Sequence, residues 1–103
     1  MVRPGIFEKG AAMRAGKRDE NEREIITTAT HAGARVIQMS ETAGFDLLVV
    51  HPSGNHIVEV KMPGRKDKLT PAERAQKNNV ERAGQVYNIV EDALDMLNVL
   101  GML

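Results

Sequence analysis

The chain of 103 residues predicts an α/β (α+β) protein, a mixed sheet flanked by helices, in the order helix, three strands, helix, strand, helix. Three observations favour this class. Two apolar, β-branched runs, residues 45–51 and 56–62, are joined by a cluster of turn formers, which is typical of a hairpin. Two segments, residues 19–33 and 70–84, combine helix start signals with apolar residues at helical spacing. A further apolar run at residues 86–90 predicts the last strand.

The first helix is expected to begin at residues 19–22, Asp-Glu-Asn-Glu, where an acceptor stands three residues before a glutamate. This is the spacing of a capping box. The apolar stripe that follows ends at Gly33, and it consists of Ile25, Ile26, Ala29 and Ala32. A short strand over residues 35–39 is expected to lead into the hairpin.

The predicted hairpin carries three charged side chains, Asp46, Glu59 and Lys61. A four-residue turn at residues 52–55 places Asp46 opposite Lys61 and diagonal to Glu59, so that all three project from one face. The two carboxylates then lie roughly 7 Å apart at the backbone, a gap that one divalent cation can bridge. A shift of one residue would separate them onto opposite faces. The alternative is an exposed cross-strand ion pair, which stabilises little.

Both faces of this hairpin are otherwise apolar, with Val58 and Val60 on one side and Leu48, Val50 and Ile57 on the other. This pattern predicts burial on both sides. Charged groups at one end of a buried hairpin need a partner, which argues against the exposed ion pair.

The second helix has a complete start signal. Thr70 is a capping residue, Pro71 stands at the first helical position, and Glu73 completes a capping box. The helix is expected to end near Gly84. The apolar stripe of this helix includes two amide side chains, Gln76 and Asn79, among small apolar residues. These amides either face a functional site or lie at the solvent-exposed edge of a narrow stripe.

The terminal helix is expected to open at Glu91 or Asp92, with Leu94, Met96 and Leu97 as its apolar anchors.

Glu22 is the carboxylate of the first helix that points inward, because it lies three and four positions before Ile25 and Ile26. Glu20 and Glu24 point further round, towards solvent. Two roles compete for Glu22. As the glutamate of the capping box it would fold back onto the helix start, and as a metal ligand it would have to leave that position.

Composition excludes several classes of protein. The chain has no cysteine, so it has no disulfide framework or thiolate metal site, which fits a reducing compartment. No apolar run approaches a membrane span, and the N-terminus lacks a signal-peptide core, so we expect a soluble, cytoplasmic protein. The single domain is small enough that dimerisation would help to complete its surface.

The formal net charge is zero, but the charge is unevenly distributed. Residues 1–18 look like a loose basic arm, and the loop after the second strand of the hairpin is also basic. Both are expected to attract phosphates, although a solvated basic tail is the commoner explanation. The bases concerned include Arg14, Lys17 and Arg18 in the arm and Arg65, Lys66 and Lys68 in the loop.

The three histidines are expected to lie on turns or on the helix surface. His51 faces His56 if the turn holds four residues, and nothing in the spacing of these residues or of His31 pairs them as metal ligands.

The ordered set Glu22, Asp46, Glu59-Val60-Lys61 and Gln76 resembles the PD-(D/E)XK nuclease superfamily. The closest likeness is to small stand-alone VRR-NUC domains, and a more distant one is to archaeal-type Holliday junction resolvases. It covers residues 19 to about 100 and implies a restriction-endonuclease-like core over 19–103, behind the arm at 1–18. One departure is Phe45, where the family usually has proline before the aspartate.

The resemblance implies a Mg²⁺- or Mn²⁺-dependent endonuclease acting on DNA, selective for branched, flapped or Holliday junction structures. Asp46 and Glu59 would hold the metal, with Glu22 acting directly or through water and the Val60 carbonyl as a further ligand. Oxygen ligands suit such hard cations. Lys61 would orient the attacking water and offset charge in the transition state.

Gln76 would then position Lys61, the water or a phosphate oxygen. The basic arm and loop would grip the DNA backbone, so that affinity falls with salt. A homodimer would place one active site on each of two DNA strands.

Two other classes remain open. One is a catalytically silent module of the same fold that binds nucleic acid without cutting it. The other is a structural interaction protein whose terminal leucines form a dimer seam, namely Leu94, Leu97, Leu100 and Leu103.

Overall fold

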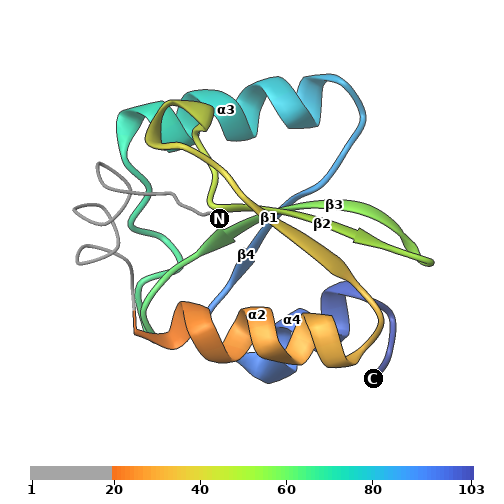
Figure 1. The fold of residues 1–103 in the computed structure, drawn as a ribbon. Helices are drawn as coiled ribbons and strands as arrows, with labels where there is room; N and C mark the ends of the chain where they lie inside the picture. Colours follow the sequence, from red (N-terminus) through yellow and green to blue (C-terminus); the bar gives the residue numbers. More distant parts are fainter. Residues whose placement is uncertain (1–19) are drawn as a thin grey trace, which may run out of the picture.

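A computed structural model describes residues 20–103 (Figure 1). Over this range, helices and strands follow in the predicted order, and a single 3₁₀ turn is added before the hairpin. The elements are α2 (Asn21–His31), β1 (Arg35–Gln38), η2 (Glu41–Ala43), β2 (Leu47–His51), β3 (Gly54–Val60), α3 (Pro71–Arg82), β4 (Tyr87–Val90) and α4 (Ala93–Val99). The mixed α/β class is therefore confirmed.

The four strands form one mixed sheet in the order β1-β2-β3-β4. The first two pairings are antiparallel, and β4 pairs parallel with β3. Helix α3 covers one face of the sheet, and α2 and α4 pack together on the other (Figure 1). We refer to these as the α3 face and the α2/α4 face.

The hydrophobic core lies between the sheet and the pair α2/α4. The largest fully buried side chains are Ile25, Leu47, Met96, Val49, Val58 and Val90. Because side chains alternate along a strand, Leu47, Val49 and Val58 share the α2/α4 face with Val90. Full burial of such a side chain stabilises the fold by about 1.5–3 kcal/mol.

The register of the hairpin differs from the predicted one. His51 pairs with Gly54, not with His56, so the turn holds only Pro52 and Ser53. Gly54 accommodates this tight reversal because it has a φ of 133°, which favours glycine. The first strand of the hairpin starts two residues later than expected, the second starts and ends two residues earlier, and the pairing is displaced by two residues.

An even displacement keeps every side chain on its predicted face. Continuing the observed register by one step beyond Leu47↔Val58 places Asp46 opposite Glu59, where Lys61 was expected. Asp46, Glu59 and Lys61 therefore still share the α3 face. The prediction of one common face holds, and the prediction of the exact partner was wrong.

The α3 face of the hairpin is only partly covered, in contrast to the predicted burial on both sides. Val50 is 37% exposed, and its neighbour Ile37 on β1 is 48% exposed. Leu48 and Ile57 are half-buried. The cause is that α3 lies over only part of this face (Figure 1).

The start of α2 confirms the inward direction of Glu22, which is 3% exposed, while Glu20 and Glu24 are exposed. Glu20 occupies the N-cap position and makes no cap hydrogen bond through its side chain. Asp19, the predicted capping acceptor, lies outside the described residues.

Helix α3 starts as predicted. Thr70 accepts a hydrogen bond from the backbone N–H of Glu73, and the Glu73 side chain accepts one from the N–H of Thr70. In α4, Asp92 caps the first turn, and Met96 is fully buried. Leu94 is 62% exposed, so its assignment as an apolar anchor was wrong.

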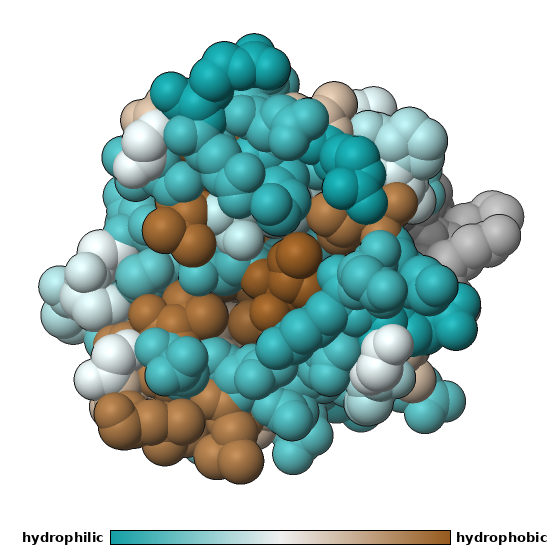
Figure 2. Space-filling model, turned by 180° about the vertical axis from the view of Figure 1, so that it is seen from behind, coloured by the Kyte–Doolittle hydropathy of each residue, from teal (hydrophilic) through white to brown (hydrophobic). Residues whose placement is uncertain are grey.

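The surface divides by polarity. Seen from behind, α3 presents a hydrophilic surface, and apolar side chains gather below it (Figure 2). Of the predicted leucine seam, Leu103 is 73% exposed like Leu94, whereas Leu100 is buried in the core. No helix within residues 20–103 has the length and apolar character needed to span a membrane.

Candidate active site

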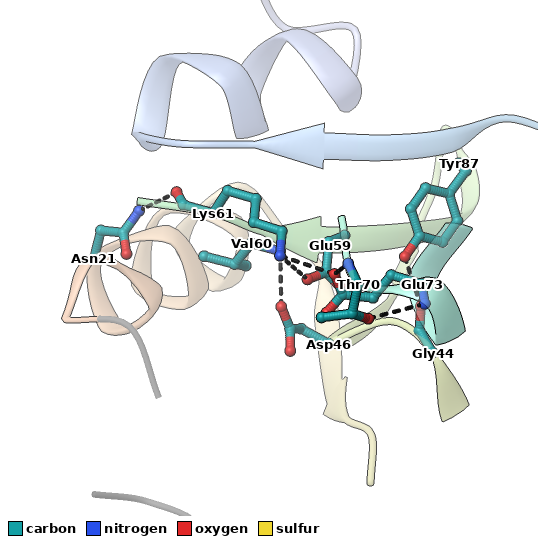
Figure 3. Close-up of polar contacts among 9 residues, drawn as sticks. All are labelled: Asn21, Gly44, Asp46, Glu59, Val60, Lys61, Thr70, Glu73 and Tyr87. Carbon is teal, nitrogen blue, oxygen red and sulfur yellow. Dashed lines mark hydrogen bonds and ion pairs between the residues drawn. The ribbon is translucent and has the colours of Figure 1, made fainter. Parts of the chain in front are cut away.

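Three carboxylates and one ammonium group meet on the α3 face, where β2 begins and β3 ends (Figure 3). Asp46 stands one residue before β2, Glu59 lies in β3, and Lys61 follows β3 directly. The third carboxylate, Glu73, comes from the first turn of α3.

Asp46 is held by the ends of three strands. Its backbone N–H donates to the Val58 carbonyl at 3.1 Å, and its carbonyl accepts from Met39 at 2.8 Å. Its carboxylate oxygen Oδ2 accepts a hydrogen bond from the Val60 N–H at 2.8 Å. The side chain is therefore turned towards the end of β3, where Glu59 lies opposite it.

Glu59 is the most deeply buried charged residue among those described, with 2% of its surface exposed. One oxygen, Oε2, lies 3.5 Å from the Lys61 Nζ. The other, Oε1, is buried and has no hydrogen-bond partner. A buried carboxylate oxygen without a partner costs free energy unless a cation or a proton satisfies it.

Glu73 fixes the Lys61 side chain. The Lys61 Nζ donates to the Glu73 Oε1 at 2.8 Å, and the same oxygen accepts the Thr70 N–H at 2.9 Å. The capping box of α3 thus holds the carboxylate that pairs with the lysine. On the other side, the Lys61 carbonyl faces Asn21 (Figure 3) and accepts a hydrogen bond from its Nδ2 at 2.9 Å.

The charges of this cluster are strongly coupled. Burial, and then the nearby charges of Asp46 and Glu73, raise the pKa of Glu59 to about 9. Burial lowers the pKa of Lys61, but the hydrogen bond and charge of Glu73 outweigh it, so this pKa lies above its usual value. Burial raises the pKa of Glu73, but Lys61 and the Thr70 N–H outweigh it and hold this pKa below its usual value. The cluster therefore keeps the Lys61–Glu73 pair charged and leaves Glu59 short of positive charge.

The loop before Asp46 is attached to α3 and β4. The Gln76 Nε2 donates to the Ala43 carbonyl at 2.8 Å, and the Tyr87 hydroxyl donates to the Gly44 carbonyl. Gly44 has a φ of 80°, and a Cβ added there would lie 2.8 Å from the Gln76 Cβ. This close approach sets the position from which Asp46 enters the sheet.

Glu22 lies on α2, which covers the opposite face of the sheet, but near the same end. Its Oε2 accepts a hydrogen bond from the Gln38 Nε2 at 3.2 Å, and Gln38 is the last residue of β1. The neighbouring Asn21 also donates to the Glu91 carbonyl at 2.7 Å, which ties the start of α2 to the end of β4. Whether Glu22 acts as a ligand stays a prediction, as does the role of the Val60 carbonyl.

The basic loop after Lys61 is exposed and anchored through its backbone. The Glu91 Oε2 accepts the N–H groups of Gly64 at 2.9 Å and of Arg65 at 3.2 Å. Lys66 pairs with Asp95 at 3.2 Å, whereas Arg65 and Lys68 form no ion pair with any residue in the described range. Arg14, Lys17 and Arg18 lie outside the described residues.

Three residues of the cluster were not singled out from sequence as site residues. Glu73 was assigned only to the capping box, although it stands one turn before Gln76 on the same helix face. Tyr87 pairs with Ile57, which places it on the face of Glu59, but no motif marks it. Asn21 acts through the backbone of Lys61, and only the tertiary structure reveals that contact.

The donor set suits a hard cation. Asp46 and Glu59 offer carboxylate oxygens on one face, and the buried Glu59 Oε1 has no hydrogen-bond partner. Within residues 20–103 no three His, Cys, Asp or Glu side chains form a ready metal cluster. The protein therefore presents a pair of carboxylates that water or a substrate oxygen would have to supplement.

No protein-family model matches this chain, and a search of curated proteins finds no significant match.

Proposed function

We propose that this protein is a metal-dependent endonuclease of the PD-(D/E)XK type that hydrolyses phosphodiester bonds in DNA. The observation that carries the proposal is the convergence of Asp46, Glu59 and Lys61 on one face at the end of the hairpin. A phosphodiester is anionic and resists attack by hydroxide, so its hydrolysis needs positive charge and an activated water together.

Asp46 and Glu59 are the proposed ligands of Mg²⁺ or Mn²⁺. The metal would supply Lewis-acid stabilisation of the phosphate and a bound water of lowered pKa. The residues favour this occupancy because Asp46 and Glu73 crowd negative charge around the buried Glu59. A divalent cation would replace the proton that Glu59 otherwise holds.

Lys61 would donate a hydrogen bond to the attacking water or to a phosphate oxygen. Its side chain is 14% exposed and its ammonium lies beside Glu59, while Glu73 keeps it charged and fixed in place. A preorganised charge of this kind stabilises the transition state without reorganisation during the reaction. Glu73 thus takes the place beside Lys61 that the resemblance gave to Gln76, and the proposed role of Gln76 becomes that of fixing the Ala43 loop.

DNA would be bound through its phosphates. Arg65 and Lys68 are exposed, form no ion pair in the described part of the chain, and directly follow the site. Aromatic residues make up only 3% of the chain, which favours recognition by backbone charge and shape over base stacking. The proposal includes selectivity for branched, flapped or four-way DNA. It also includes a homodimer.

A panel of labelled DNA structures tests this function. Incubation with Mg²⁺, Mn²⁺ or chelator should give cleavage only with metal. Asp46→Asn and Lys61→Met should lower the rate by roughly 10²-fold or more, as loss of transition-state charge stabilisation does. Their controls are Glu24→Gln on α2 and Lys77→Met on α3, which remove one charge of each sign away from the cluster and from the basic loop.

Full activity of either site variant, verified as folded by circular dichroism, would refute the assignment. Binding of branched DNA without product in Mn²⁺ would favour the non-cleaving module instead.

A further inference from the structure

A second polar cluster lies at the tip of the β2–β3 hairpin, at the opposite end of these strands from Asp46 (Figure 1). His51 closes β2, Ser53 stands in the turn, and His56 lies in β3. The Ser53 Oγ is 2.8 Å from the His51 Nδ1 and 2.8 Å from the His56 Nε2. The tight turn brings the rings together because it places both histidines on the α2/α4 face.

The backbone fixes the tautomer of His51. Its Nδ1 accepts the Ser53 N–H at 3.0 Å, so this nitrogen carries a lone pair. Its Nε2 then carries the hydrogen and donates to the Ala32 carbonyl at 3.0 Å, at the end of α2. A ring whose Nε2–H is held by a carbonyl has the arrangement typical of a histidine that binds a metal through Nδ1. A metal at the His51 Nδ1 would replace the Ser53 N–H that this lone pair accepts here.

The Ser53 hydroxyl bridges the two rings. Its O–H can donate to the His51 Nδ1 while its oxygen accepts from the His56 Nε2–H, so two ring nitrogens converge on one oxygen. A cation bonded to both rings would take the place of this bridge and would need His56 in the tautomer whose hydrogen is on Nδ1. Neutral imidazole suits Zn²⁺, Cu²⁺ and Ni²⁺, whereas Mg²⁺ and Mn²⁺ prefer oxygen ligands.

We propose that His51 and His56 form a site for a borderline transition-metal ion such as Zn²⁺, with the Ser53 hydroxyl or water completing the coordination. No third His, Cys, Asp or Glu joins the pair in the described part of the chain. The site is separate from the proposed hard-cation site in position, face and ligand chemistry. It does not depend on the nuclease proposal.

Titration of the untagged, metal-free protein with Zn²⁺ by calorimetry tests this site. The Asp46→Asn variant lacks one carboxylate of the other cluster. Saturable Zn²⁺ binding by this variant would therefore be assigned to the hairpin tip. His51→Ala and His56→Ala should each weaken this binding roughly tenfold or more. His31→Ala is the matched control, because His31 is an exposed histidine at the end of α2.

A second measurement keeps the proposal falsifiable even if His51→Ala loosens the hairpin. Co²⁺, a paramagnetic stand-in for Zn²⁺, should affect the NMR signals of His51 and His56 most strongly and leave those of α3, on the opposite face of the sheet, unchanged. Absence of saturable Zn²⁺ binding, equal binding by His56→Ala, or broadening centred on another residue would overturn the proposal. None of these outcomes bears on DNA cleavage, so the two proposals fail separately.

Discussion

At the residue scale, Glu59 shows how burial changes the chemistry of a carboxylate. It is nearly inaccessible, its neighbours are negative, and one of its oxygens has no hydrogen-bond partner. Lys61 lies nearby, but its shorter contact is with Glu73. The balance of charge therefore leaves room for one more positive charge beside Glu59, which either a proton or a metal ion can supply.

The pH dependence of stability tests this balance. The pKa of Glu59 is about 9 in the folded protein against an ordinary value of 4.5. The folded state thus binds the proton more tightly, so the stabilisation is complete below about pH 4.5 and is lost as the pH rises towards 9. Denaturant unfolding in chelator should show stability falling over this range.

Glu59→Gln should flatten that slope, because the amide does not titrate. The matched control is Glu24→Gln on the exposed face of α2, where the side chain is in water in both states. Equal slopes for the wild-type protein and Glu59→Gln would contradict the assignment of this proton to Glu59.

Glu73 is predicted to position Lys61. Glu73→Gln retains an acceptor for the Thr70 N–H, so the capping box can survive, while the charge that holds the ammonium is lost. Relative to cleavage by the wild-type protein, kcat should fall roughly tenfold or more with KM unchanged, as expected for a contact used in the transition state.

The control for Glu73→Gln is Glu81→Gln, which breaks the exposed Lys77–Glu81 pair on the same helix. Exposed pairs of this kind contribute about 0.3–0.5 kcal/mol, so kcat should not change. A rise in KM without loss of kcat in Glu73→Gln would assign the residue to binding instead.

At the scale of elements, the contact between the η2 loop and α3 determines where Asp46 enters the sheet. Gly44 and Gly64 both have left-handed backbone angles, with φ of 80° and 84°. An added Cβ at Gly44 meets the Gln76 Cβ at 2.8 Å, whereas at Gly64 it meets nothing within 4 Å. Substitution of both glycines therefore distinguishes the cost of backbone strain, which both positions share, from the cost of a steric clash, which only Gly44 has.

Alanine at either glycine should cost about 1–3 kcal/mol in backbone strain. Gly44→Ala should cost about 1–3 kcal/mol more, because the helix must shift to relieve the clash. Comparison of the two free energies of unfolding in urea measures the difference. Equal losses would show that the approach of the loop to α3 is not tightly packed.

At the scale of the whole molecule, the net charge of zero conceals a local basic surface beside the site. Glu91 anchors the loop through the backbone of Gly64 and Arg65, which leaves the Arg65 side chain exposed. Lys66 is partly neutralised by Asp95. The basic side chains of this loop should therefore contribute unequally to DNA binding.

Arg65→Ala and Lys68→Ala should each weaken DNA binding and reduce the slope of log K against log salt by about 1. Lys66→Ala should have a smaller effect, because its partner Asp95 already offsets its charge. Fluorescence anisotropy at several salt concentrations measures both quantities. An unchanged slope in Arg65→Ala would place the phosphate contacts elsewhere on the protein.

Local patterns in the sequence were sufficient to predict the elements of this protein. The capping box of α3, the glycine after α2 and the alternation in the hairpin each depend on neighbours close in sequence. The common face of Asp46, Glu59 and Lys61 was predictable for the same reason. The wrong register did not affect it, because a displacement of two residues preserves the direction of side chains.

Only the tertiary structure decided which groups pair across distance. Three sets of hydrogen bonds depend on it: Lys61 with Glu73, Gln76 with the Ala43 carbonyl, and the two histidines with Ser53. The exposure of Leu94 and the partial cover of the α3 face also depend on where the helices lie. Periodicity tells which side of an element a residue occupies, but contacts between elements are set by packing in three dimensions, which no local pattern encodes.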